Sequence, residues 1–145
     1  MSRSRDEQYL GDMRRFPVYG AAITLSTRME THMSKVPVWL KMSRCNRLKN
    51  MVMDILLYIY HARTLGHIKE NCIEGIRMID AMKFELRTMK DAGYLTPTGF
   101  GMIANQAEEV RRQLKNWAIS HGAAPEEFPQ AFNLYKKDEN IRIFE

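Results

Sequence analysis

The stretch PVWLKMSRCNRLKNMVMDILLYIYHAR, residues 37–63, decides the fold because its apolar residues repeat with the period of an α-helix. One set recurs at spacings of three and four residues and predicts a core-facing stripe: Cys45, Leu48, Val52, Ile55, Leu56 and Ile59. A second apolar stripe, offset from the first, consists of Met53, Leu57 and Tyr60. A helix that is apolar on two sides must be buried on two sides. We therefore expect this helix to contact its own bundle and a second protein surface, although a central position within a monomer would satisfy the same pattern.

Three further amphipathic helices are predicted, at about residues 18–33, 68–92 and 97–121. Their core-facing stripes are Val18, Ala21, Ala22, Leu25, Met29 and Met33; Cys72, Ile76, Ile79, Met82, Leu86 and Met89; and Ile103, Ala107, Val110, Leu114 and Trp117. The expected start signals are Pro37, and Thr96 with Pro97, and the expected stop signals are Gly66, Gly93 and Gly122. Gly75 interrupts the third stripe and suggests a close contact between helices.

The connections between these helices are short, which forces consecutive helices to run antiparallel. The sequence therefore predicts an all-α fold, an antiparallel up-and-down four-helix bundle spanning residues 16–121. A basic, mobile N-terminal arm of residues 1–15 precedes it. An irregular tail of residues 122–145 follows, and it has three apolar side chains with which to dock on a neighbour: Phe128, Phe132 and Ile143.

The positive charge is concentrated in the first third of the chain. Residues 1–50 hold ten Lys and Arg against four acids, a net +6, whereas residues 51–145 hold twelve against thirteen, a net −1. No acid lies between Thr31 and Met53. Such a localised basic surface is typical of proteins that bind a polyanion, most often nucleic acid.

The basic side chains form stripes on three of the predicted helices. The candidate nucleic-acid-binding residues are Lys41, Arg44, Arg47 and Lys49 on the second helix, Lys83, Arg87 and Lys90 on the third, and Arg111, Arg112 and Lys115 on the fourth. Cations in these positions bind phosphates with an affinity that falls steeply as salt rises and with little specificity for the nucleotide sequence. On the third and fourth helices, a solvated face balanced by Asp80, Glu85, Glu108 and Glu109 is the alternative.

No motif in the chain indicates catalysis. There is no phosphate-binding glycine loop, no HExxH and no Glu-x-x-His pair, and the four histidines lie at or near helix ends. We therefore expect no catalytic residue, no cofactor, no metal site and no small-molecule substrate, and elemental analysis for a bound metal would test this. Two isolated cysteines, the absence of an export signal and an apolar run too short to span a membrane favour a cytoplasmic location and no membrane partner.

Three stretches, within roughly residues 18–121, resemble a known family: the Ser-Lys-Val-Pro turn with its basic-then-apolar helix ending in His61-Ala62, the segment MIDAMKFELRTMKDAGYLTP, and AEEVRRQLKNW. The chain is similar to the accessory variability determinant proteins of diversity-generating retroelements, and to the four-helix-bundle proteins encoded in ribosomal RNA intervening sequences. The positions that match are Pro37, Arg44, Arg47, Leu86, Arg87, Leu114 and Trp117.

This resemblance implies a ring-like homopentamer that binds the retroelement reverse transcriptase together with RNA and possibly DNA. Its role would be to support synthesis of mutagenised complementary DNA from template-repeat RNA, without being a catalyst itself. A structural or protein-interaction bundle without a reverse-transcriptase partner, like the intervening-sequence relatives, is the alternative. An adjacent reverse transcriptase gene with variable and template repeats would distinguish the two.

Overall fold

The computed structural model describes Met13 and residues 16–130, and all the regular secondary structure in this part of the chain is helical. The four long helices are α2 (Pro17–Met33), α4 (Asn46–Leu65), α5 (Ile68–Asp91) and α6 (Pro97–Ser120). The three short elements are α3 (Val38–Leu40), the π-helical η1 (Lys41–Cys45) and the 3₁₀ turn η2 (Pro125–Glu127). The predicted all-α class is therefore confirmed.

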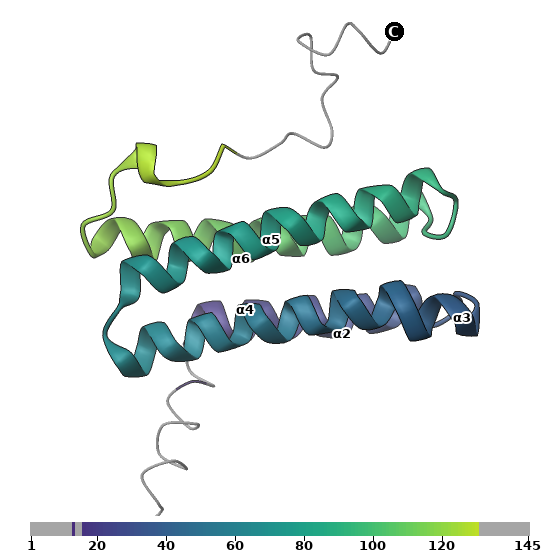
Figure 1. The fold of residues 1–145 in the computed structure, drawn as a ribbon, viewed down its shortest axis with the longest axis horizontal. Coiled ribbons are helices and arrows are strands. Elements are labelled where there is room, and N and C mark those ends of the chain that lie inside the picture. The colour runs from purple at the N-terminus through teal and green to yellow at the C-terminus, as the bar shows by residue number, and fades with distance from the viewer. Residues whose placement is uncertain (1–12, 14–15, 131–145) are drawn as a thin grey trace, which may run out of the picture.

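The four long helices lie side by side along the long axis of the molecule (Figure 1). Helices α2 and α5 each pack against both α4 and α6. One apolar core fills the space between the helices, and every long helix contributes fully buried side chains to it. The fold is thus bundle-like, with a single core.

The helix ends follow the predicted capping chemistry. Gly66 ends α4 at φ 78° and Gly93 follows α5 at φ 83°, and glycine adopts this left-handed conformation without a steric penalty. Thr96 caps α6, since its hydroxyl accepts a hydrogen bond from the Gly99 amide at 3.0 Å, and Pro97 occupies the first turn. The observed bounds of α2, α5 and α6 lie within two residues of the predicted ones.

The helix predicted from Pro37 differs from the observed one in two ways. Pro37 has an extended ψ of 150° and is the N-cap, so the helix begins at Val38. The next turn is π-helical, with the Asn46 amide bonded to the Lys41 carbonyl. Within this turn the Ser43 hydroxyl donates to the carbonyls of Trp39 at 2.9 Å and Leu40 at 3.4 Å. A simple helical period does not reveal such an inserted turn.

The predicted core stripes are buried, apart from three side chains that are only half-buried, Ala21, Leu56 and Trp117. Two of the large side chains that are fully buried were not predicted, Leu40 and Phe100. The second stripe of α4 is exposed: Met53 by 55%, Leu57 by 48% and Tyr60 by 40%. A single chain therefore does not enclose α4 on both sides, and the interpretation of α4 as the enclosed centre of a monomer is wrong.

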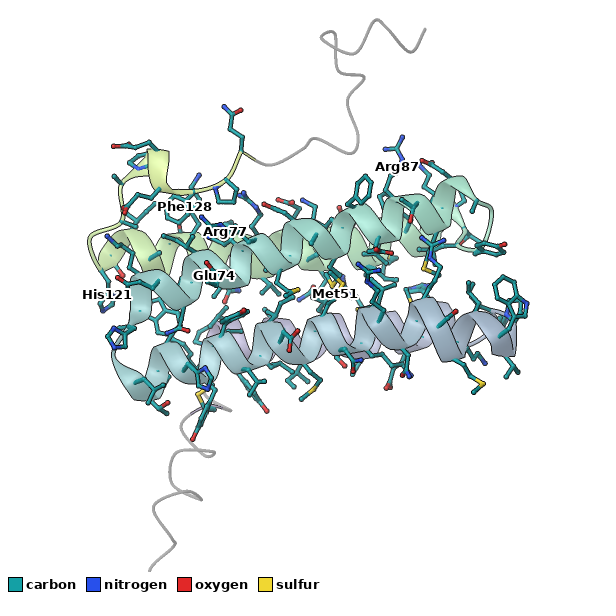
Figure 2. The ribbon with its side chains drawn as sticks, in the orientation of Figure 1. Met51, Glu74, Arg77, Arg87, His121 and Phe128 are labelled. Carbon is teal, nitrogen blue, oxygen red and sulfur yellow. The ribbon has the colours of Figure 1, made fainter. Side chains whose placement is uncertain are left out.

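Both predicted appendages contribute to the core. Met13, within the predicted mobile arm, is buried, and its carbonyl accepts a hydrogen bond from the Phe16 amide at 3.0 Å. In the predicted tail, Ala123 and Phe128 are buried, and Figure 2 shows Phe128 beneath the tail segment that contains η2. Phe132 and Ile143 lie outside the described residues. Among those described, no helix is both long and apolar enough to cross a membrane.

Candidate nucleic-acid and partner interfaces

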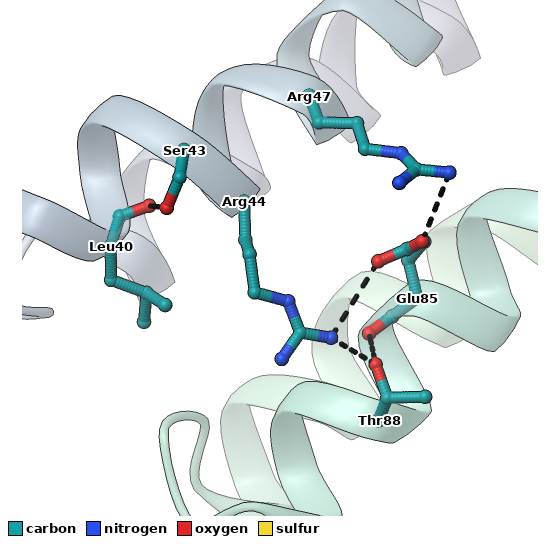
Figure 3. A network of polar contacts seen from close by, with 6 residues as sticks. All are labelled: Leu40, Ser43, Arg44, Arg47, Glu85 and Thr88. Atoms are coloured by element: carbon teal, nitrogen blue, oxygen red, sulfur yellow. Dashed lines mark hydrogen bonds and ion pairs between the residues drawn. The ribbon is translucent and has the colours of Figure 1, made fainter.

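Residues 38–49, the basic segment, carry four of the predicted phosphate-binding cations. Two of them, Arg44 and Arg47, reach from this segment to Glu85 on α5 (Figure 3). Their guanidinium nitrogens lie 3.6 Å and 3.3 Å from the Glu85 carboxylate oxygens. Arg44 also donates to the hydroxyl of Thr88, which in turn donates to the Glu85 carbonyl at 2.7 Å. One carboxylate thus partly neutralises two of the predicted phosphate-binding cations. Although the segment itself lacks acids, α5 supplies one, which the sequence alone did not reveal.

Lys41 and Lys49 extend the basic segment on either side of these arginines. Both lysines are exposed, and neither forms an ion pair with any acid in the described part of the chain. Their charges and that of Arg44 act on the buried thiol of Cys45, where they oppose the rise in pKa that burial causes. Lys41 and Lys49 are therefore the members of this segment best placed to bind phosphate.

Lys83 and Arg111 do not belong to an exposed basic face, and their predicted role in nucleic-acid binding is corrected here. Lys83 is only 5% exposed and pairs with Glu108 of α6, and burial lowers its pKa. Arg111 is 8% exposed, and its Nε donates to Asp80 Oδ1 at 2.9 Å. Each cation instead bridges α5 and α6. The sequence alone does not distinguish a charged side chain that faces solvent from one that pairs with an acid on the next helix, because both occupy positions beside the core face.

The other four predicted cations of α5 and α6 already have partners within the chain. Arg87 donates to Asp91 at 3.1 Å, and Arg112 pairs with Glu109 at 2.5 Å. The hydrogen bonds from Arg112 and Gln113 lower the pKa of Glu109 to about 2. The remaining two cations lie over aromatic rings, Lys90 at 5.0 Å from the Phe100 centroid and Lys115 at 5.6 Å from that of Phe128. These contacts favour the alternative of a balanced, solvated face on α5 and α6.

The exposed stripe of α4 is the candidate partner interface. Met53, Leu57 and Tyr60 follow one another at helical spacing, with the Tyr60 ring 5.9 Å from the ring of His61. More apolar surface lies at the start of the basic segment, where Val38, Trp39 and Met42 are strongly exposed. Sequence reasoning did not single out this second group, although an aromatic residue beside a run of cations was the available signal.

A pocket of ≈ 260 Å³ opens where α4, α5 and α6 meet near Phe16, and it is lined by Phe16, Ala62, Arg63, Ile68, Trp117 and His121. The rings of Phe16 and Trp117 pack edge to face at 4.7 Å. Figure 2 shows His121 at the opposite end of the molecule from Arg87. The pocket has no paired acid and base, and its histidine Nδ1 is already within 3.1 Å of the Trp117 carbonyl.

The described residues contain no cluster of three or more His, Cys, Asp or Glu side chains that could hold a metal ion. Cys45 and Cys72 are both free and buried, as predicted for small core residues. Burial raises the pKa of Cys72 to about 12, so its thiol is not a nucleophile at neutral pH.

No known family model matches this chain, and no curated protein or solved structure is significantly similar to it.

Proposed function

We propose that this protein is a non-catalytic, oligomeric accessory protein of the cytoplasm that binds a retroelement reverse transcriptase and RNA or DNA. In this role it supports mutagenic synthesis of complementary DNA from template-repeat RNA. The observation that carries the proposal is the division of one helical segment, residues 38–65, into two exposed surfaces. Its first half presents two lysines that pair with no acid in the described part of the chain, and its second half presents an apolar stripe. The identity of the polymerase rests on the family resemblance alone.

The proposed architecture is an antiparallel up-and-down bundle. It is supported by the pairing of each long helix with two others and by short connections at residues 34–37, 66–67 and 92–96. Short connections leave consecutive helices no room to run in the same direction. This arrangement places the exposed stripe of α4 on the outside of the bundle, where a partner can cover it.

The proposed partner surface consists of Met53, Leu57 and Tyr60. Three large apolar side chains in consecutive turns form a contiguous patch, and such patches mark sites of protein association. Identical copies of the chain or the polymerase would cover it. The homopentamer that we propose for the assembly comes from the resemblance.

The proposed nucleic-acid surface is the basic segment, with Lys41 and Lys49 as the cations that no described acid neutralises. Phosphates bound there would displace condensed counterions, so affinity would fall steeply with salt. Arg44 and Arg47 would contribute less, since Glu85 already balances part of their charge.

The test is to remove both of these lysines and measure RNA binding. Lys41→Gln/Lys49→Gln should weaken binding of a short labelled RNA and reduce the slope of log affinity against log salt by about 1.4 to 1.8. A matched control is Arg63→Gln/Arg77→Gln, which removes the same charge from exposed sites on α4 and α5 outside the basic segment. Equal losses in both variants would mean that net charge, and not this segment, attracts the RNA.

The reverse-transcriptase partner needs a separate test. Copurification of the full chain with a reverse transcriptase encoded beside it would support this half of the proposal, and replacing Leu57 with Lys should then reduce recovery of the polymerase. Failure to recover the polymerase with the unaltered chain would argue against the partner.

The second candidate is a structural bundle that binds other proteins and has no polymerase partner. The convergence of Arg44 and Arg47 on Glu85 favours it, because an internal ion pair lowers the positive potential that nucleic acid would meet. It predicts no RNA binding at physiological salt and no adjacent reverse transcriptase gene.

A further inference from the structure

Trp39 and Tyr94 form an exposed aromatic pair at one end of the molecule. Trp39 stands on α3, and Tyr94 stands in the turn between α5 and α6. Their rings pack edge to face, with centroids 5.6 Å apart and an interplanar angle of 86°. Trp39 nevertheless remains 59% exposed and Tyr94 38% exposed. Because each ring covers only part of the other, ring surface is left open to solvent.

Three lysines lie within four residues of this pair in sequence. Lys35 precedes Trp39 by four residues and Lys41 follows it by two, and both are exposed. Lys90 precedes Tyr94 by four residues, although its ammonium lies over the Phe100 ring. The Tyr94 amide donates to the Met89 carbonyl at 2.9 Å and so fixes the start of this turn. The nearby acid Asp91 already accepts hydrogen bonds from Arg87. The local charge is therefore positive.

Open aromatic rings beside cations are the features with which proteins bind single-stranded nucleic acid. Every base has a π face that stacks on an aromatic side chain, while Lys and Arg track the phosphates. A base within a duplex is already stacked and paired, so it has no free face to offer.

We propose that Trp39 and Tyr94 form a stacking site for an unpaired base of single-stranded RNA or DNA, whose backbone runs along Lys41 and its neighbouring cations. The inference rests on the proposed nucleic-acid function and makes it more specific, since it names single strands as the preferred ligand. A protein partner would also contact Val38 and Met42, but the surrounding lysines favour a polyanion.

The test compares single-stranded and duplex oligonucleotides of one sequence, as RNA and as DNA, against variants of Trp39 in the full chain. Trp39→Leu keeps an apolar side chain but removes the aromatic face, whereas Trp39→Phe keeps a ring. Trp39→Leu should weaken single-strand binding about tenfold with an unchanged salt slope and leave duplex binding unaltered. Trp39→Phe should restore most of the affinity. Phe84→Leu, which alters an exposed aromatic residue outside the basic segment, should have no effect.

Fluorescence gives a second, direct measurement. The chain has two tryptophans, and Trp117 packs against Phe16 away from this pair. Single-stranded RNA should quench the emission of the unaltered chain, and this quenching should be lost in Trp39→Phe, where Trp117 alone emits. Quenching that persists in Trp39→Phe would overturn the assignment.

The outcomes separate the stacking site from the general function. If Lys41→Gln/Lys49→Gln weakens RNA binding but Trp39→Leu does not, nucleic-acid binding stands and the stacking site is wrong. If the unaltered chain binds no oligonucleotide, both are wrong. If Trp39→Leu lowers the mass of the assembly in light scattering, the pair belongs to a contact between copies, which also overturns the stacking site.

Discussion

Asp80 on α5 and Arg111 on α6 form a two-pronged ion pair across the interface between these helices. Arg111 Nε donates to Oδ1 at 2.9 Å and Nη2 donates to Oδ2 at 3.3 Å. The same Nη2 donates to the carbonyl of Pro129 at 2.7 Å, so the Arg111 guanidinium contacts both α5 and the tail segment. Asp80→Ala would leave this buried cation without its carboxylate, and we expect the free energy of unfolding in urea to fall by about 2–3 kcal/mol.

The matched control is Glu109→Ala, which also removes an acid paired with an arginine of α6. That arginine, Arg112, is exposed, and exposed ion pairs contribute less than about 1 kcal/mol. A loss in Asp80→Ala no larger than in Glu109→Ala would show that the buried pair contributes nothing special to the packing of α5 against α6.

Gly75 lies at a close contact between α5 and α6. A Cβ placed there would lie 3.0 Å from Leu114 Cδ1 and 3.7 Å from Tyr58 Cβ. Alanine favours a helix by about 1 kcal/mol over glycine, but overpacking a core costs about 1–3 kcal/mol. Because Leu114 is fully buried and has little room to move, we expect Gly75→Ala to lower stability in urea unfolding.

Gly101 provides the control for this prediction, since it also lies within a helix but a Cβ there would meet nothing within 4 Å. Gly101→Ala should therefore raise stability by about 0.5–1 kcal/mol. If Gly75→Ala is equally stabilising, the Leu114 side chain moves aside at little cost and Gly75 is not required for packing.

The sequence predicted the elements of this fold well because local chemistry determines them. The capping of α6 by Thr96 and the end of α4 at Gly66 depend on residues within one turn, and periodicity identified the buried faces. The π-helical turn at Lys41–Cys45 was missed because the apolar periodicity of the segment does not reveal an inserted turn.

The candidate site was predicted less completely because ion pairs join residues that are distant in sequence. Glu85 lies more than 35 residues from Arg47, and no local pattern links them. Burial of Arg111 likewise depends on Asp80 and on the return of the chain to Pro129. By contrast, the exposed stripe of α4 followed from its own periodicity, since one helix with two apolar faces exceeded what a single core could cover.

That exposed stripe predicts self-association or a protein partner. Leu57→Lys places a charge at the centre of the stripe without touching the core, so it should lower the mass of the assembly in sedimentation while the helical content stays unchanged. Ile119→Lys, at a residue of similar exposure on α6, is the control and should leave the mass unaltered. An unaltered chain that sediments as a monomer at micromolar concentration would contradict assembly of identical copies.

The contacts that Glu127 makes between the tail segment and α5 should weaken in acid. Its carboxylate accepts the Ala124 amide at 2.7 Å and the Lys69 ammonium at 3.0 Å, and these contacts lower the pKa of Glu127 while raising that of Lys69. A carboxyl whose folded pKa lies below its unfolded value, about 4.3, stabilises the docked tail fully above that value. The contribution is lost as pH falls through the lowered pKa, so docking should weaken in the range below about pH 4.

The NMR cross-peak of the Ala124 amide, which donates to the Glu127 carboxylate, would report this weakening as the pH is lowered. Glu127→Gln removes the titrating group, so the acid-dependent shift of the cross-peak should disappear. Glu126→Gln changes an exposed neighbour in the same 3₁₀ turn and should leave the profile unaltered. Because Arg111 and buried Phe128 also hold the segment, the tail of Glu127→Gln should remain docked at neutral pH. A profile that is the same in Glu127→Gln as in the unaltered chain would assign the transition to a different carboxyl group.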